Sequence, residues 1–205
     1  MIKSFAKRAV QGLGYDVRRF SPLASDAPRL EMMLKSHAVD LVFDVGANAG
    51  QFARSLRDLG YRIGLNLMQV TARSPEELTA LASAVQGWGT VEVLYFADSL
   101  GNMSPSAIDS VVSALRRGWT GPIGVHTHDN MGQALANSLA AIAAGVTWID
   151  GTILGMGRGA GNARIEHLLL ELERRGFDRY RPSALFHVVA EDFEPLRAQY
   201  GWGTN

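Results

Sequence analysis

Residues 124–169 read GVHTHDNMGQALANSLAAIAAGVTWIDGTILGMGRGAGNARIEHLL, and this stretch decides the fold. The short apolar run at 123–128 predicts a strand, and residues 132–145 predict a helix that ends at a glycine. Residues 146–153 predict the next strand. Strands and helices that alternate with short connections indicate a parallel sheet with crossover helices.

The same alternation continues toward the amino terminus. Ser-Pro pairs at 74–75 and 104–105 predict two helix starts, because serine caps a helix and proline fits its first turn. Glu77, three residues after Ser74, adds a predicted capping box at the first of them. The predicted strands are 41–46, 63–70, 91–98, 123–128 and 146–153, and the predicted helices are a short one ending near His37, 49–59, 74–86, 104–118, 132–145, 163–175 and 182–199. A closed eight-stranded barrel of this kind needs about 250 residues. We therefore predict an α/β fold that forms a partial (β/α)8 barrel.

Composition limits the kinds of partner and compartment. The chain has 205 residues, with 20 basic and 20 acidic side chains and a net charge of +0, so no global charge favours nucleic acid. No apolar run reaches the roughly 18 residues of a membrane span. The chain contains no cysteine, which excludes disulfides, thiolate metal sites and cysteine nucleophiles. We expect a cytoplasmic protein with no membrane span and no nucleic-acid partner.

His126 and His128 are candidate metal ligands. They lie two residues apart on a predicted strand, so their side chains leave the same face. They also lie near the carboxyl end of that strand, which is the edge where parallel α/β folds bind ligands. Two imidazoles favour a divalent metal, although such a site usually has three or more protein ligands. Taken alone, the pair is more often two ordinary hydrogen-bonded histidines than a metal site.

Four motifs in order resemble the metal-dependent aldolase/lyase superfamily of triose-phosphate-isomerase-type barrels. They are ADSLGNMSP at 97–105, His-x-His-Asp from His126, Ala-x-Ala-Asn ending at Asn137, and Gly-x-Gly-x-x-x-Gly-Asn at 155–162. The superfamily includes 4-hydroxy-2-oxovalerate aldolases, hydroxymethylglutaryl-CoA lyases and isopropylmalate synthases. The resemblance covers roughly residues 61–205 and implies a TIM-type barrel.

The resemblance implies a role for each matching residue. Its metal ligands correspond to His126, His128 and Asn162, and its substrate-facing groups correspond to Asp98, Asp150, Gly157 and Gly159. The implied reaction makes or breaks a carbon–carbon bond in a 2-oxo acid, with a divalent metal, Mn or Mg, as Lewis acid. Asp98 and Asp150 are equally compatible with strand-end carboxylates that form turns.

Two departures from the superfamily pattern affect the reaction. Hydroxymethylglutaryl-CoA lyases carry a catalytic cysteine in the glycine-rich loop, and this chain has none. The oxo-acid aldolases are therefore the better match. The superfamily's first strand carries an Arg-Asp signature, whose Asp is a third metal ligand and whose Arg stabilises the enolate. No equivalent precedes Tyr61, because Arg57-Asp58 falls in a predicted helix.

The first sixty residues resemble a different family. VFDVGANAGQFARSLRDLGY at 42–61 is similar to the start of an FkbM-type methyltransferase, which uses S-adenosylmethionine (SAM). A strand that ends at Asp44 and a turn with Gly46 and Gly50 would contact that cofactor. The match stops near Arg62, where the next strand lacks the acidic residue that holds the ribose. We therefore expect a methyltransferase-like segment at 1–60 and an aldolase-like partial barrel at 61–205.

Three functions follow from these resemblances. The first is a metal-dependent aldolase-like lyase, impaired by the loss of the first barrel strands, whose partner is a small 2-oxo acid. The second is a SAM-dependent methyltransferase-like cofactor binder. The third is a non-catalytic fusion remnant that self-associates as a homo-oligomer through unclosed sheet edges. The pattern also breaks off at YGWGTN, residues 200–205, which leads us to expect a truncated carboxyl terminus.

Overall fold

The computed structural model describes residues 26–45, 51–177 and 179–203, which belong to two units. The units divide between Asp40 and Leu41. The described part of the first unit contains helix α2, Asp26–Ser36, and the remaining elements belong to the second unit. None of the helices in the described part of the chain combines the length and the apolar composition that a membrane span requires.

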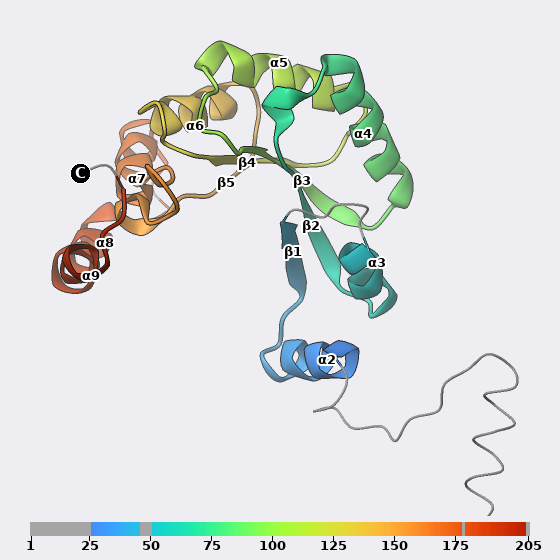
Figure 1. The fold of residues 1–205 in the computed structure, drawn as a ribbon, viewed down its shortest axis with the longest axis horizontal. Helices are drawn as coiled ribbons and strands as arrows, with labels where there is room; N and C mark the ends of the chain where they lie inside the picture. The colour runs from blue at the N-terminus through green and yellow to red at the C-terminus, as the bar shows by residue number, and fades with distance from the viewer. Residues whose placement is uncertain (1–25, 46–50, 178, 204–205) are drawn as a thin grey trace, which may run out of the picture. The chain divides into compact units, whose positions relative to one another are not determined.

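The second unit is built on a parallel sheet of five strands in the order β1-β2-β3-β4-β5. The strands are β1 Leu41–Val45, β2 Arg62–Leu67, β3 Val91–Asp98, β4 Ile123–Thr127 and β5 Trp148–Ile149, and the crossover helices are α3 Gln51–Asp58, α4 Pro75–Trp88, α5 Pro105–Arg116 and α6 Ala134–Ala143. Helices α4, α5 and α6 follow one another along one side of the curled sheet (Figure 1). This arrangement confirms the predicted α/β fold and the partial (β/α)8 barrel.

Two predicted strands, β2 and β5, end three or more residues before their expected ends, because the backbone beyond each strand bonds to another segment. Strand β2 ends at Leu67 because Gln69 adopts a left-handed conformation, with φ of 54°, and its N–H donates to Ser99 Oγ at 2.8 Å. The chain then enters the short 3-10 helix η1, Val70–Ala72. Strand β5 ends at Ile149 because the backbone beyond it pairs elsewhere: the N–H of Thr152 donates to the carbonyl of Ala163 at 2.9 Å.

The glycine-rich segment and the last helices complete the second unit. The 3-10 helix η2, Ile153–Gly155, leads into the glycine-rich segment, residues 155–162, and then to helix α7, Ile165–Arg174. The single helix predicted at 182–199 is divided into α8 Pro182–Val188, the π-helical segment η3 Val189–Phe193 and α9 Glu194–Tyr200. A π segment is a local widening of a helix, which sequence patterns do not reveal.

The two faces of the sheet have different side chains. Leu94 pairs with Ile123 in register, and both are fully buried together with other apolar residues of this row. Thr127 lies on the same face, and its hydroxyl contacts Ser138 Oγ of α6 at 2.9 Å, which identifies this face as the helix-covered one. The alternation along β4 therefore places His126 and His128 on the opposite face.

Helix α4 begins with a capping box, as the sequence predicted. Ser74 Oγ accepts the N–H of Glu77 at 3.2 Å, and the Glu77 carboxylate accepts the N–H of Ser74 at 2.7 Å. We expect Ser74→Ala to lower the free energy of unfolding by about 1 kcal/mol, because it removes one of these two caps. Urea denaturation checks this, with the exposed mid-helix Ser110→Ala as the matched control. Equal stabilities of the two variants would contradict it.

Candidate functional site

His126, in β4, and His128, one residue beyond the end of β4, lie side by side on the face of the sheet away from the helices. Their ring centroids are 4.8 Å apart and their ring planes are perpendicular. Each imidazole uses its Nδ1 atom in a hydrogen bond to another strand end. The two Nε2 atoms make no hydrogen bond to any described residue, so each ring has one nitrogen left for a ligand.

The tautomer of His128 follows from its partner. Its Nδ1 atom lies 2.8 Å from the backbone carbonyl oxygen of Asp98. A carbonyl oxygen only accepts hydrogen bonds, so Nδ1 carries the proton. In the neutral ring, Nε2 therefore has a lone pair. This is the arrangement that metal-ligating histidines use, with the second nitrogen oriented by a carbonyl or a carboxylate.

His126 is oriented by a carboxylate in the same way. Its Nδ1 atom donates to Asp150 Oδ1 at 2.6 Å. This hydrogen bond raises the pKa of His126 above its ordinary value, burial lowers it, and the negative charge of Asp150 raises it again. The net direction is upward. The neutral ring again has its lone pair on Nε2, and protonation of that atom competes with ligand binding.

Replacing the carboxylate tests this account. We expect Asp150→Asn to lower the pKa of His126 toward its ordinary value, because the amide supplies no negative charge. NMR titration of the His126 ring protons measures the change. Asp109→Asn, on the exposed side of α5, is the matched control and should leave the pKa unchanged. A His126 pKa that stays raised in Asp150→Asn would contradict the assignment of its cause.

The same pair gives stability a defined dependence on pH in the metal-free protein. A histidine whose folded pKa is raised stabilises the fold below its unfolded pKa, as long as Asp150 is ionised. That contribution is lost as the pH rises through the folded pKa of His126. The advantage of the wild type over Asp150→Asn in free energy of unfolding should therefore shrink over that range.

Asn162 lies directly beside His128. The two residues form an antiparallel backbone bridge, and the flanking N–H of Asp129 donates to the carbonyl of Gly161 at 2.9 Å. The Asn162 side chain donates from Nδ2 to the Met156 carbonyl at 3.1 Å. Its Oδ1 atom is buried and has no hydrogen-bond partner among the described residues. A buried oxygen without a hydrogen-bond partner lowers the stability of the fold, so we expect this atom to bind a ligand or a water molecule.

The other predicted site residues have different surroundings. The carboxylate of Asp98 is fully buried and accepts the N–H groups of Asn102 at 3.1 Å and Met103 at 3.2 Å, so it closes its own loop. Gly157 lies against Asn162, where an added Cβ would come within 2.8 Å of Nδ2. Gly159 has a φ of +64°, and an added Cβ there would make an ordinary contact with Asn130 Nδ2 at 3.8 Å.

Two residues on the face of His126 were not predicted as site residues. Tyr95 pairs in register with Gly124, two residues before His126, and burial, followed by the charge of Asp150, raises its pKa far above the ordinary value. Asn66 pairs with Tyr95, and its buried Oδ1 has no partner among the described residues. The period of two along β3 and β4 was the only sequence signal for this row.

Glu166 was also missed. Its carboxylate is buried, and both oxygens accept the N–H of Leu154 at 3.2 Å. Its one sequence signal was an acidic residue in the first turn of the helix that follows the glycine-rich segment. Glu166 therefore helps to hold the backbone at Leu154, which leads into the glycine-rich segment.

The residues predicted for SAM are only partly described. Asp44 lies in β1, in register with Leu65, while Gly46 and Gly50 fall outside the described residues. None of the relatives named below is a methyltransferase.

Within the described residues, no group of three or more His, Cys, Asp and Glu side chains gathers as a metal site would require. A metal at this edge would therefore need Asn162 beside the two histidines.

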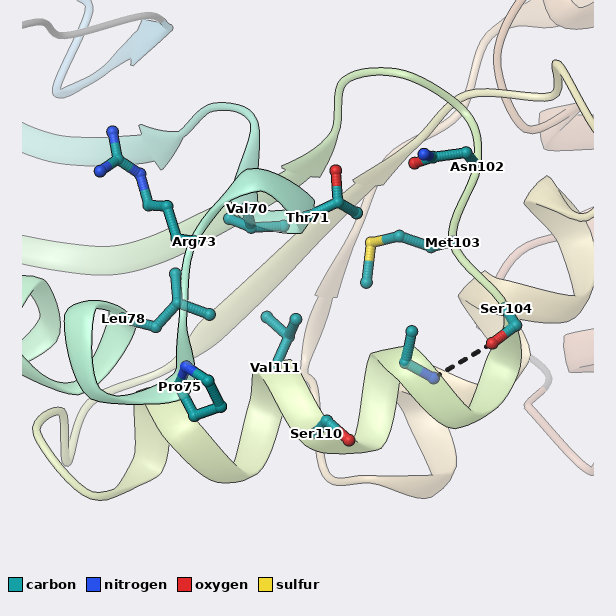
Figure 2. A pocket seen from close by; sticks show the side chains of 11 residues that line it. Val70, Thr71, Arg73, Pro75, Leu78, Asn102, Met103, Ser104, Ser110 and Val111 are labelled. Atoms are coloured by element: carbon teal, nitrogen blue, oxygen red, sulfur yellow. Dashed lines mark hydrogen bonds between the residues drawn. The ribbon is translucent and has the colours of Figure 1, made fainter.

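A separate pocket of about 350 Å³ lies between η1, the start of α4 and the start of α5. Figure 2 shows apolar side chains, among them Leu78, Met103 and Val111, with Arg73 at one side. None of the residues that line it is a predicted metal or substrate residue. The pocket and the histidine site are therefore two different places on the second unit.

Comparison with known proteins agrees with the fold and the motifs. The sequence profile of the HMGL-like family matches residues 30–190. The chain is 40% identical over 122 residues to a 4-hydroxy-2-oxovalerate aldolase of Geobacillus genomosp. 3, covering 60% of this chain and 36% of the relative. It is 37% identical over 157 residues to one of Bacillus cereus, covering 75% of this chain and 44% of the relative. The chain thus spans about two fifths of these relatives.

Solved structures have the same fold. The N-terminal domain of a protein assigned as an aldolase from Bacteroides vulgatus superposes with a TM-score of 0.74 at 29% identity, over 88% of this chain and 62% of that one. The carboxyl transferase domain of Rhizobium etli pyruvate carboxylase superposes with a TM-score of 0.69 at 22% identity, over 86% and 32%, which is a likeness of fold alone. With a profile match over more than half of its length, this chain belongs to the HMGL-like family.

Proposed function

We propose that this chain carries part of the active site of a metal-dependent aldolase-like lyase that acts on a 2-oxo acid. The observation that carries the proposal is the set of unused donors at the end of β4. These are Nε2 of His126, Nε2 of His128 and the buried Oδ1 of Asn162, none of which has a hydrogen-bond partner among the described residues. The names of the two relatives given above, both 4-hydroxy-2-oxovalerate aldolases, support the substrate class.

The donor set fits a divalent metal ion. Imidazole nitrogen and amide oxygen are both ordinary ligands of such ions, and three protein ligands leave positions for substrate. We propose Mn or Mg as the metal, held by His126, His128 and Asn162. When bound, the metal would act as a Lewis acid that polarises the oxo group of the substrate.

The surrounding residues have supporting roles in this proposal. Asp150 and the Asp98 carbonyl hold the two imidazoles in the tautomers that leave Nε2 unprotonated. The raised pKa of Tyr95 keeps its hydroxyl protonated, which suits a hydrogen-bond donor to a substrate oxygen rather than a base. An added Cβ at Gly159 would have one heavy atom within 4 Å, Asn130 Nδ2 at 3.8 Å, and we propose that the carboxylate end of the substrate lies on this side.

The test is a retro-aldol assay with 4-hydroxy-2-oxovalerate. Cleavage of its C3–C4 bond releases pyruvate and acetaldehyde, as the 4-hydroxyl loses its proton and C3 gains one. We expect Mn²⁺-dependent pyruvate release that disappears when His126 and His128 are both changed to alanine. Release that persists in this double variant would overturn the proposed site. A folded wild type that neither binds Mn²⁺ nor releases pyruvate would overturn the proposed function.

A further inference from the structure

We propose that Trp202 is a positioning residue for the glycine-rich segment. Together with Glu166, it holds Leu154 and so fixes the side-chain amide of Asn162. The inference rests on the proposed function only where it concerns metal binding. The geometry that carries it lies among Leu154, Glu166, Trp202 and Asn162.

Leu154 has a backbone conformation that needs support. It adopts φ of 52° and ψ of 25°, the left-handed region that side chains with a Cβ disfavour. Leu154 is also buried, with 6% of its surface exposed. Such a conformation persists where the surroundings hold it in place, and residues of this kind gather at functional sites.

Both peptide groups that flank Leu154 are held by side chains from other elements. On one side, its N–H donates to the two carboxylate oxygens of Glu166 at 3.2 Å each. On the other side, its carbonyl oxygen accepts the indole N–H of Trp202 at 3.3 Å. Glu166 comes from α7, while Trp202 follows α9 and lies 48 residues from Leu154. The support is therefore tertiary and independent of the local sequence.

The position of Trp202 is itself fixed. Its backbone carbonyl accepts the Nε–H of Arg197, on α9, at 3.3 Å. An added Cβ at the next residue, Gly203, would lie 4.0 Å from the carbonyl oxygens of Leu154 and Ala160. The chain after α9 thus runs along the glycine-rich segment.

The residues after Leu154 form the cradle of Asn162. The Gly155 carbonyl accepts the Asn162 backbone N–H at 3.2 Å, and the Met156 carbonyl accepts its side-chain Nδ2 at 3.1 Å. Gly157 lies so close to Nδ2 that no Cβ would fit without a shift. With Nδ2 committed to Met156, Oδ1 is the amide atom left for a ligand. A shift of the backbone at Leu154 would therefore also displace the Gly155 and Met156 carbonyls that hold Asn162.

The experiment replaces Trp202 with phenylalanine, which keeps an aromatic ring and removes the indole N–H. Trp88→Phe, at an exposed position of α4, is the matched control. Two quantities are measured on the full chain: solvent exchange of the Asn162 side-chain amide by NMR, and Mn²⁺ affinity by calorimetry. We expect exchange to be about threefold faster or more, and Mn²⁺ affinity about three- to tenfold weaker, in Trp202→Phe only, as the loss of one hydrogen bond predicts.

The outcomes separate this inference from the proposed function. Faster Asn162 exchange without Mn²⁺ binding by any variant would support the positioning role and overturn the metal site. Exchange and affinity equal to those of Trp88→Phe would overturn the positioning role and leave the metal site standing. If Trp202→Phe does not fold, Glu166→Gln tests the same support from the other side of Leu154. An unchanged Asn162 amide in that variant would overturn the inference.

Discussion

Changing both His126 and His128 to alanine is expected to abolish Mn²⁺ binding by this chain. The change removes both imidazole donors and leaves Asn162 Oδ1 as the single donor of the proposed set. Removing a group that only orients a ligand typically costs 10- to 100-fold in metal affinity, so removing two ligands should cost more than about 100-fold. Calorimetric titration with Mn²⁺ measures the loss.

The matched control removes the same number of imidazoles elsewhere. His167 and His187 are both exposed on the carboxy-terminal helices, so His167→Ala combined with His187→Ala should bind Mn²⁺ as the wild type does. Circular dichroism of both double variants verifies that they are folded. If the two double variants bind Mn²⁺ equally, the metal site does not lie at the end of β4.

The sheet could be predicted because its signals are local. Strand β3 was predicted with its observed bounds, because a run of apolar residues ends at an aspartate that closes the following loop. The capping box of α4 was predicted from Ser74, Pro75 and Glu77, since these three residues satisfy one another within a single turn. Neither prediction needed any knowledge of distant residues.

The metal ligands were proposed from spacing and resemblance, but the orientation of their rings could not be predicted from the sequence. That His126 and His128 share a face follows from alternation along a strand. That each Nδ1 is engaged depends on Asp150 and Asp98, which lie 24 and 30 residues away along the chain. For Asp98 the sequence left two alternatives open, a substrate-facing group and a turn-forming carboxylate, and the two N–H groups that it accepts from its own loop fit the second.

Tertiary contacts account for the parts of the site that sequence analysis missed. Glu166 was given no role from the sequence, and it is buried against a backbone N–H twelve residues away. Trp202 lies in a tail for which no role was predicted, and it contacts the glycine-rich segment. Such contacts are set by how helices α7 and α9 pack, and no spacing rule encodes that packing.

The glycine-rich segment gives the second large effect, at Gly161. An alanine Cβ there would lie 2.0 Å from the carbonyl oxygen of Gly155, and the backbone φ is +89°. The clash falls on rigid backbone, and the Gly155 carbonyl also accepts the N–H of Asn162. We expect Gly161→Ala to reduce the free energy of unfolding by about 3 kcal/mol, from backbone strain and overpacking together. Urea denaturation measures it.

Gly159→Ala separates the two causes within the same loop. Gly159 has a similar positive φ of +64°, but the nearest atom to an added Cβ is Asn130 Nδ2 at 3.8 Å, which is ordinary contact. This variant should therefore lose about 1 kcal/mol, from backbone strain alone. The difference between the variants isolates the clash with Gly155.

Because that clash displaces the residues that hold Asn162, Gly161→Ala should also lose Mn²⁺ binding while Gly159→Ala retains it. Equal stabilities would mean that the loop relaxes freely, and that Asn162 is not held by the close packing of Gly155 and Gly161.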